Sequence, residues 1–239
     1  MKQIRWVEAS DLFEGFGYGK AISALSSLLE SGFDPAKDHS RLHVNFDNGE
    51  GLLMPSEIGD RVGLKFVTVA PSNPAKGLDR IQGIYSLLDA ATLTPLLQCD
   101  GAALTLLRTS SMTAATVKRL RPPETPKMAI FGSGPQAVAH ALALRHATSA
   151  NQIYLFARNP ATANTAISRL LSEGFDATLG DSEQLANADI VVTVTSSTQP
   201  LFAEKDVKAN VIIAAVGSHT PNSRELTGEL MASGSVYVE

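Results

Sequence analysis

Three small residues in the second half of the chain, Gly132, Gly134 and Ala137, have the types and spacing that bring a backbone close to a pyrophosphate. They follow the apolar run M-A-I-F (128–131) and precede a segment rich in alanine and leucine. Gly132 permits a tight turn, Gly134 allows the close approach, and Ala137 lets a helix pack on its strand. The free N–H groups at the start of that helix would face the phosphates. The spacing therefore predicts a dinucleotide site.

Alternating strands and helices are predicted around and after this motif. Strands are expected at residues 128–131, 152–157, 176–179, 189–195, 210–216 and 236–238, and helices at 135–147, 160–172 and 182–187. Such alternation, with strands this apolar, predicts a parallel sheet covered on both faces. Because Glu239 closes the chain on a predicted strand, we expect the nucleotide domain to be incomplete at its C-terminus and to leave apolar surface exposed.

A different pattern occupies the first half of the chain. An apolar piece (4–7) and a glycine-rich turn (G-F-G-Y-G, 15–19) precede a predicted helix, several strands and a second helix. The first helix is expected at 20–31, strands at 41–46, 51–55, 62–69, 81–89 and 95–99, and the second helix at 103–120. Short turns between these strands favour an antiparallel or mixed sheet.

The proline-rich segment R-P-P-E-T-P (121–126) is the clearest domain boundary, because its three prolines cannot continue a helix. The predicted fold class is α/β. An α+β domain for substrate binding and dimerisation (1–121) precedes a Rossmann-type domain with a parallel sheet (122–239).

Composition excludes several functional classes. The 239 residues are 44% hydrophobic and 18% charged with a net charge of −4, which argues against nucleic acid or a membrane as a partner. The single Cys99 provides no disulfide framework, and the histidines show no metal-binding spacing, so no metal is expected. Without an apolar signal or membrane-spanning run, the cytoplasm is the expected location. The histidines interpreted as structural or surface residues are His39, His43, His140 and His146.

The choice of cofactor can be predicted from the end of the predicted strand 152–157, the next strand after the motif's own. A carboxylate there would bind the ribose 2′-hydroxyl and favour NAD. This chain has Arg158 and Asn159 instead, and a cation suits a 2′-phosphate, so we expect NADPH, with NADH as the alternative. The alternative is that Arg158 stacks on adenine or faces solvent.

Two cations interrupt apolar runs in the first half. Lys65 lies within V-G-L-K-F-V and Arg108 within L-T-L-L-R-T. A single cation is usually a solvated surface charge, whereas these positions suggest a more specific role.

Several segments, taken in order, resemble the ornithine cyclodeaminase/mu-crystallin family. They are L-M-P (53–55), V-G-L-K-F-V-T-V (62–69), P-S-N-P-A-K-G-L (71–78), A-L-T-L-L-R-T-S-S (103–111), F-G-S-G-P-Q-A (131–137), A-D-I-V-V-T-V-T-S-S (188–197) and A-V-G-S-H-T-P-N-S-R-E-L (215–226). The resemblance implies a protein that uses NAD(H) or NADP(H), acts on small amino or imino acids, and dimerises through its first domain. It also implies a longer chain, with a C-terminal segment that returns to that domain.

The resemblance also implies roles for individual residues. Arg41, Lys65 and Arg108 match positions that bind a substrate carboxylate, and Lys65 and His219 are the expected catalytic residues. Leu52 stands where the family has a glutamate for the amino end of ornithine, and His219 stands where it has the aspartate of cyclodeamination. His219 could be a proton donor, a contact to nicotinamide, or a loop residue near the cofactor. The residues expected to bind the cofactor are Thr109, Gly132, Ser133, Gly134, Pro135, Gln136, Arg158, Asn159, Thr195, Ser196, Val216 and Gly217.

An apolar Leu52 cannot pair with an ammonium group, so these substitutions disfavour ornithine cyclodeamination. The expected function is NAD(P)H-dependent reduction of a small cyclic imino acid, of the type that converts 1-pyrroline-2-carboxylate to L-proline, by a homodimer. The alternatives are an ornithine cyclodeaminase, an alanine-type amino-acid dehydrogenase, or a non-enzymatic protein that binds NADPH or a small ligand.

Overall fold

A computed structural model describes residues 4–218 and 222–238, which divide into two compact units. The first contains residues 1–20 and 27–108, and the second contains residues 21–26 and 109–239. The division falls inside helix α3 (Gly101–Arg119), whereas the proline-rich segment predicted as the boundary follows that helix. The assignment of a substrate-binding domain to 1–121 and a nucleotide-binding domain to 122–239 stays a prediction.

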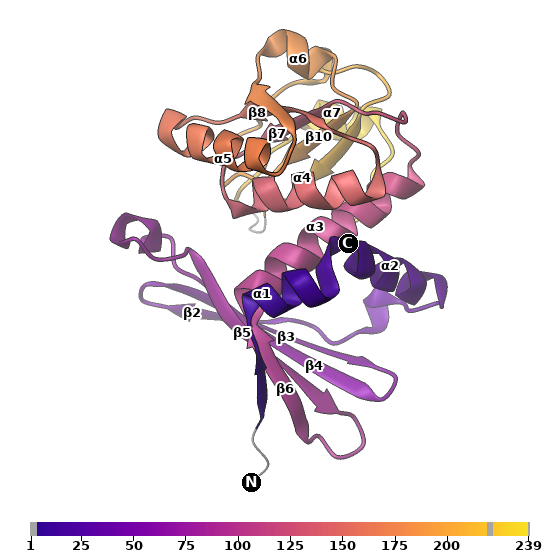
Figure 1. The fold of residues 1–239 in the computed structure, drawn as a ribbon, viewed down its shortest axis with the longest axis vertical. Coiled ribbons are helices and arrows are strands. Elements are labelled where there is room, and N and C mark those ends of the chain that lie inside the picture. Colours follow the sequence, from indigo (N-terminus) through magenta and orange to yellow (C-terminus); the bar gives the residue numbers. More distant parts are fainter. Residues whose placement is uncertain (1–3, 219–221, 239) are drawn as a thin grey trace. The chain divides into compact units, whose positions relative to one another are not determined.

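The first unit contains a six-stranded sheet, here called sheet A, in the order β1-β6-β5-β4-β3-β2 (Figure 1). Its strands are β1 (Arg5–Val7), β2 (Leu42–Phe46), β3 (Gly49–Ile58), β4 (Arg61–Val69), β5 (Ile81–Asp89) and β6 (Pro95–Asp100). Neighbouring strands from β2 to β6 are antiparallel, and β1 joins β6 in parallel. The prediction of a mixed sheet is confirmed.

The two faces of sheet A differ in burial. Along β4, Lys65, Val67 and Val69 are buried, whereas Phe66 and Thr68 between them are partly exposed. This alternation is typical of a sheet covered on one face only. Figure 1 shows α1 and the start of α3 on one side of sheet A. Asp100 begins α3, because its Oδ1 accepts hydrogen bonds from the backbone N–H groups of Ala102 and Ala103 at 2.8 and 2.9 Å.

The expected glycine-rich turn at 15–19 is wrong. Residues 9–30 are helical, as α1 (Ala9–Asp11), a π-helical turn η1 (Leu12–Phe16) and α2 (Gly17–Glu30). Gly17 has a φ of 68°, which a residue with a side chain rarely adopts, so this glycine redirects the helix rather than ending it. Short 3-10 turns occur at η2 (Pro35–Lys37) and η3 (Asn73–Lys76).

The second unit contains a parallel sheet, here called sheet B, in the order β11-β10-β7-β8-β9. Its strands are β7 (Met128–Phe131), β8 (Gln152–Phe156), β9 (Asp176–Leu179), β10 (Ile190–Thr193) and β11 (Ile212–Ala215), and its helical elements are α4 (Pro135–Ala147), α5 (Pro160–Ser172), α6 (Ser182–Ala186), η4 (Glu204–Asp206) and α7 (Gly228–Ser233). The first strand in sequence, β7, lies between the second, β8, and the fourth, β10. This is the doubly wound order, with its switch point between β7 and β10.

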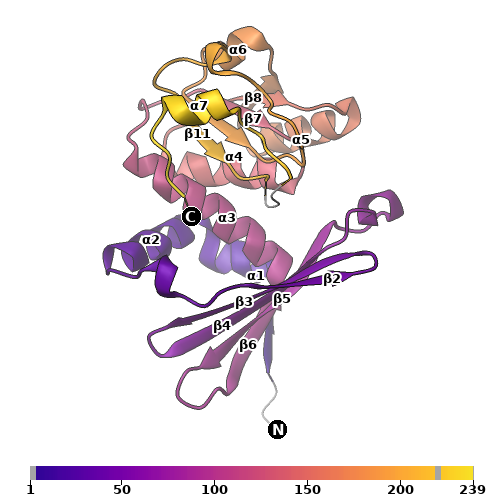
Figure 2. The ribbon, with the colours of Figure 1, turned by 180° about the vertical axis from the view of Figure 1, so that it is seen from behind.

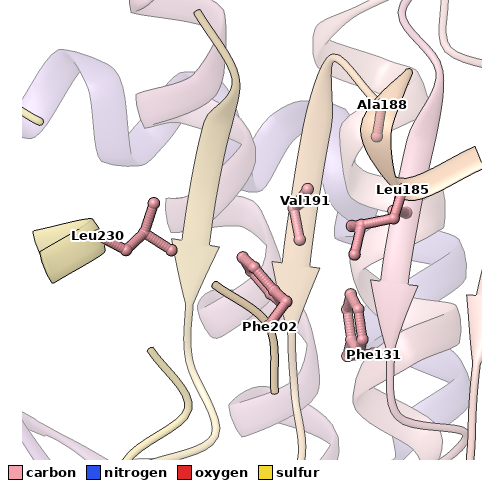
Figure 3. Packing of buried hydrophobic residues seen from close by; sticks show 7 residues of the cluster. Phe131, Leu185, Ala188, Val191, Phe202 and Leu230 are labelled. Atoms are coloured by element: carbon pink, nitrogen blue, oxygen red, sulfur yellow. The ribbon is translucent and has the colours of Figure 1, made fainter. Parts of the chain in front are cut away.

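The central strands of sheet B, β7 and β10, are buried on both faces, as predicted for this sheet. On one face Phe131 stacks on Phe156 with ring centroids 4.5 Å apart and contacts Phe202 at 5.1 Å. Leu185 of α6 and Leu230 of α7 complete this apolar cluster (Figure 3). Figure 2 shows the ribbons of both helices in the second unit, with α7 in yellow. The other residues of the cluster are Ala129, Ala188 and Val191. Met128 and Ile130 point to the opposite face by strand alternation and are also fully buried.

The last predicted strand is wrong. Val236, Tyr237 and Val238 are exposed and pair with no strand within the described residues, and an apolar triplet needs a partner strand to become one. Helix α7, which precedes them, was not predicted. No helix within the described ranges has both the length and the hydropathy needed to cross a bilayer.

Candidate cofactor and substrate sites

The fingerprint loop connects β7 to α4 in the second unit. Gly132 has a φ of 118°, and a Cβ there would lie 2.8 Å from the carbonyl oxygen of Val194, so only glycine fits this turn. A Cβ on Gly134 would meet nothing within 4 Å, which leaves its backbone open to an incoming group. Pro135 is the first residue of α4, and Ala137 is fully buried against the sheet. Each position therefore has the surroundings that a pyrophosphate loop requires.

The segment after β8 contains the two residues, Arg158 and Asn159, that are predicted to decide between NADPH and NADH. Arg158 is exposed, with no hydrogen bond or ion pair to the described part of the chain. Asn159 caps α5, because its Oδ1 accepts hydrogen bonds from the N–H groups of Ala161 and Thr162 at 2.9 and 3.4 Å. Ser133 reaches this helix, with its Oγ 2.8 Å from Thr162 Oγ1. The Arg158 guanidinium is therefore available to a ligand, whereas the Asn159 side chain already caps a helix.

Two further loops follow β10 and β11 at the same edge of sheet B. Val194 N donates to the carbonyl of Phe131 at 2.9 Å, so the loop after β10 lies beside the fingerprint strand. Of the predicted cofactor residues here, Ser196 is exposed, and Val216 and Gly217 are partly exposed. The Thr195 hydroxyl already donates to Glu225 Oε1 at 2.6 Å. Ligands of doubly wound sheets bind at this carboxyl edge, at the switch point.

Sequence reasoning gave no role to Glu225, although it lies within a segment that matched the family. Its carboxylate is 2% exposed and accepts hydrogen bonds from Thr193, Thr195 and Gly217. Local spacing contains no signal for it, because the strand-end loops that it contacts come from β10 and β11.

Buried acceptors without a partner test whether a ligand fits. Among the described residues, Gln136 Oε1, Thr109 Oγ1 and Ser111 Oγ are buried without a hydrogen-bond partner. Buried polar atoms are normally satisfied, so each is a position where a ligand or water would bond. Gln136 and Thr109 are predicted cofactor residues, and their unsatisfied oxygens fit the hydroxyl and amide donors of a nicotinamide dinucleotide.

His140 is a structural residue of α4, as the sequence suggested. Its Nδ1–H donates to the carbonyl of Gln136 at 2.8 Å, and its Nε2 lies 3.2 Å from the Thr113 hydroxyl, which donates to it. Burial lowers the pKa of His140 to about 4, against the opposing effect of the bond to Gln136. The ring is therefore neutral at physiological pH.

Lys65 stands at the centre of the covered face of sheet A. Its side chain is 8% exposed, and it is paired with Met54 on β3 and with Tyr85 on β5. The row continues to Cys99 on β6. A buried ammonium group needs partners that replace its lost hydration, so Lys65 differs from an ordinary surface lysine.

The other two residues predicted to bind the substrate carboxylate, Arg41 and Arg108, lie in the same unit as Lys65. Leu42 pairs with Leu53, so extending the antiparallel register by one residue sets Arg41 opposite Met54. Arg41 is then two strands from Lys65 in the same row, about 10 Å between backbones. Arg108 is partly buried on α3, which begins directly after β6. Sheet register thus brings Arg41 and Lys65 together, and Arg108 belongs to the helix that follows the sheet.

The residue that precedes Met54 on the Lys65 face of β3 is apolar. Leu52 shares its face, since Leu52 pairs with Val67, two residues along β4 from Lys65. Glu50 is on this face too, two residues beyond Leu52 along β3, and its carboxylate contacts His43. Glu50 therefore already has a partner in His43. Leu52, not an acidic residue, is the residue before Met54 on this face of β3.

The remaining titratable groups of this row are poor nucleophiles. Burial raises the pKa of the Cys99 thiol to about 11, with a smaller effect from Asp100, so it stays protonated. Burial also raises the pKa of Tyr85, whose ring lies over Gly63. Within residues 4–218 and 222–238, no group of three or more His, Cys, Asp or Glu side chains is placed to hold a metal ion. His219 lies outside the described residues.

Known proteins with similar sequences include reductases and cyclodeaminases. The chain is 33% identical over 198 residues to a Delta(1)-pyrroline-2-carboxylate reductase of Bacillus cereus, covering 80% of this chain and 60% of that protein. It is 31% identical over 191 residues to an ornithine cyclodeaminase of Brucella suis biovar 1, covering 78% and 53%. The chain thus spans between about half and two thirds of the length of these relatives.

Solved structures share the fold. A Delta(1)-pyrroline-2-carboxylate reductase of Thermococcus litoralis, in complex with NADH and L-proline, superposes with a TM-score of 0.86 at 24% identity, over 95% of this chain and 73% of that one. An archaeal alanine dehydrogenase dimer with bound NAD gives a TM-score of 0.85 at 23% identity, over 96% and 72%. The sequence profile of one family matches residues 18–239, nearly the whole chain. The chain therefore belongs to the ornithine cyclodeaminase/mu-crystallin family.

Proposed function

We propose that this chain carries the nucleotide and substrate sites of an NAD(P)H-dependent reductase of small cyclic imino acids, of the type that converts 1-pyrroline-2-carboxylate to L-proline. The observation that carries the proposal is Lys65, a buried cation whose neighbours on the same sheet face include the apolar residues Leu52, Met54 and Val67. An anion-binding group on an apolar floor suits a substrate that has one carboxylate and a hydrocarbon ring. The similarity to a Bacillus cereus reductase of that name supports it.

Different residues of the chain bind the substrate and the cofactor. Lys65 and Arg41, with Arg108, hold the substrate carboxylate through charge-assisted bonds, each contributing about 1.5–3 kcal/mol. This fixes the C=N bond in one orientation, and placement contributes much of the rate. The loop from Gly132 to Gln136 holds the pyrophosphate, and Arg158 binds the 2′-phosphate of NADPH, with NADH as the alternative cofactor.

The proposed reduction transfers one hydride and one proton to the C=N bond and uses no metal or thiol. When bound, the reduced nicotinamide supplies a hydride to the imine carbon. The imine nitrogen would take one proton from His219 or from water, which completes the reduction to the cyclic amino acid. His219 is proposed for this step because imidazole titrates near neutral pH.

Ornithine cyclodeamination is the second candidate, favoured by the similarity to the Brucella suis protein. Leu52 opposes it, because an apolar side chain leaves the distal ammonium group of ornithine unpaired. An alanine-type dehydrogenase and a non-enzymatic NADPH-binding protein are the remaining alternatives.

The proposal includes a homodimer in the cytoplasm, where Cys99 stays reduced. On the face of sheet A opposite Lys65, Leu42, Val44 and Phe46 of the edge strand β2 are exposed, and Ile84 lies in the same row as Leu42. A second copy that pairs the same face would cover these side chains. The similar alanine dehydrogenase structure is itself described as a dimer.

A cofactor-oxidation assay with a panel of substrates tests the function. NADPH and NADH would each be offered with 1-pyrroline-2-carboxylate, its six-membered homologue and pyruvate plus ammonia, and L-ornithine would be offered with NAD⁺. We expect reduction of a cyclic imine, with no product from ornithine. Ammonia and proline from ornithine would establish the cyclodeaminase instead, and nucleotide binding without turnover of any substrate would favour the binding protein.

A further inference from the structure

Glu225 is a buried carboxylate that none of the functions above uses. It lies between β11 and α7 and is 2% exposed. Oε1 accepts from Thr195 N at 2.8 Å and Thr195 Oγ1 at 2.6 Å, and Oε2 accepts from Thr193 Oγ1 at 2.8 Å and Gly217 N at 2.7 Å. Within the part of the chain that the structure describes, no cation pairs with it. The four donors replace the water that the carboxylate loses on burial.

These bonds connect two loops that come from different strands. Thr195 follows β10 and Gly217 follows β11, and both lie at the carboxyl edge of sheet B. The contact is tight, because a Cβ on Gly217 would lie 2.1 Å from the carbonyl oxygen of Thr195 and 2.7 Å from Glu225 Oε1. The Gly217 N–H also lies 3.2 Å from the carbonyl of Thr193. One carboxylate therefore sets the backbone positions of both loops.

The position of these loops gives the carboxylate a function. A dinucleotide lies across the switch point of a doubly wound sheet. In this sheet the pyrophosphate loop follows β7 and Arg158 follows β8, so the adenosine half belongs over β7 and β8. The nicotinamide half then belongs over β10 and β11, where Glu225 acts.

We propose that Glu225 is a positioning residue, which holds the backbone at Thr195 and Gly217 in the arrangement that receives the nicotinamide-ribose half of the cofactor. The inference rests on the nucleotide site of the proposed function. It goes beyond that site because it gives a role in binding the nicotinamide half to Glu225, whose side-chain hydrogen-bond partners all lie outside the pyrophosphate loop.

The hydrogen-bond pattern provides a sharp substitution. In Glu225→Gln the side chain keeps its size but has only one acceptor oxygen. Backbone N–H groups face both ends of the carboxylate, one from Thr195 and one from Gly217. Whichever way the amide is turned, its NH₂ group opposes one of these fixed donors. Thr195→Val is a milder change, which removes the side-chain donor to Oε1 and the acceptor of the Ser197 N–H and leaves the carboxylate in place.

The experiment compares two ligands by titration calorimetry. The first is whichever of NADPH and NADH the unmodified protein binds more tightly, and the second is ADP, which lacks the nicotinamide half. We expect Glu225→Gln to weaken binding of the dinucleotide about tenfold or more, and binding of ADP less than about twofold. Thr195→Val should give a smaller loss for the dinucleotide alone. Glu229→Gln, which makes the same chemical change at an exposed residue of α7, should bind both ligands normally.

The outcomes separate the possible failures. Equal losses for dinucleotide and ADP in both Glu225→Gln and Thr195→Val would reduce Glu225 to a residue that only stabilises the fold. Unchanged dinucleotide affinity in a folded Glu225→Gln variant would also overturn the inference. If Glu225→Gln does not fold, selective loss of dinucleotide binding in Thr195→Val still supports positioning, and its absence contradicts it. An unmodified protein that binds neither ligand would overturn the nucleotide site itself, and this inference with it.

Discussion

Lys65 and Arg158 are both cations, but their surroundings suit them to different ligands. Lys65 is buried in the centre of a sheet face beside Met54, so its charge acts in a low dielectric. Arg158 is exposed after β8, where water screens its charge and a phosphate can reach its fork of N–H donors. We therefore expect a large energetic effect at Lys65 and a selective but smaller one at Arg158.

The variant Lys65→Met should weaken substrate binding without unfolding the protein. Methionine matches the length of the lysine stem, and the neighbouring Met54 shows that this row accepts it. Loss of a charge-assisted carboxylate contact should lower kcat/KM for the cyclic imine by about 10- to 150-fold, which corresponds to about 1.5–3 kcal/mol. Steady-state kinetics measure this, together with a nucleotide titration that should be unchanged.

The exposed Lys76 of η3 offers the matched control, since Lys76→Met removes the same charge from the same unit. It should retain full kcat/KM. If Lys65→Met keeps its kcat/KM within about threefold, roughly 0.7 kcal/mol, then Lys65 does not hold the carboxylate.

The variant Arg158→Asp should reverse or remove a preference for NADPH. The aspartate repels a 2′-phosphate and can accept a hydrogen bond from a ribose 2′-hydroxyl. We expect NADPH affinity to fall by about tenfold or more relative to NADH, with Lys205→Asp, at an exposed residue of η4, as the control. Direct titration of both cofactors measures the ratio. Equal affinity of the unmodified protein for the two cofactors would remove the basis of this prediction.

At the scale of single elements, helix α4 has an accessible N-terminus and a buried middle. Gly134 leaves its first turn accessible, whereas His140, one turn after Gln136, is fully buried and bonded to the Thr113 hydroxyl. The helix that would face the phosphates is thus held at its middle by a neutral imidazole. Its attachment depends on that ring staying unprotonated.

Acid should therefore weaken the fold through His140. The pKa is about 4 in the folded state and 6.5 as the reference, so the unfolded state binds the proton first as pH falls. Stability is fully present above pH 6.5 and is lost between there and about 4. From pH 7 to pH 5 the loss should be about 2 kcal/mol in the free energy of unfolding. Urea denaturation at the two pH values measures it.

The variant His140→Asn should remove that part of the pH dependence, although it lowers stability at both pH values. Equal losses from pH 7 to pH 5 in the unmodified protein and in His140→Asn would exclude His140 as the source.

Elements were predictable where local chemistry determines them. The limits of α4 and α5 follow the prolines at their first positions, and the apolar run at β7 gives its strand directly. The helix at residues 9–16 was missed because nearby glycines normally end helices, whereas Gly17 only redirects this one. Glu225 could not be found in the sequence, because its partners Thr193 and Gly217 meet it only after β10 and β11 are aligned. The residues of the pyrophosphate loop were predictable since they are contiguous.

At the scale of the whole molecule, sheet A has an apolar surface that residues 4–218 and 222–238 leave exposed. Leu42, Val44 and Phe46 alternate along β2, the edge strand, and are 58%, 44% and 53% exposed. The Phe46 and Phe66 rings lie over Gly51 on this face, where a Cβ would approach them to 2.8 and 3.0 Å. An exposed apolar edge strand is a site of association unless a specific partner covers it.

We therefore expect the protein to be a dimer that the double variant Val44→Lys/Phe46→Lys converts to monomers. In a two-fold interface each substitution acts twice, so lysines would bring like charges together and remove apolar burial from both copies. Sedimentation velocity at several concentrations measures the change in mass. Leu171→Lys, at an equally exposed leucine of α5 in the other unit, is the control and should stay dimeric. If the unmodified protein is monomeric at all concentrations, or if the double variant remains dimeric, then the exposed face of β2 is not the dimer interface.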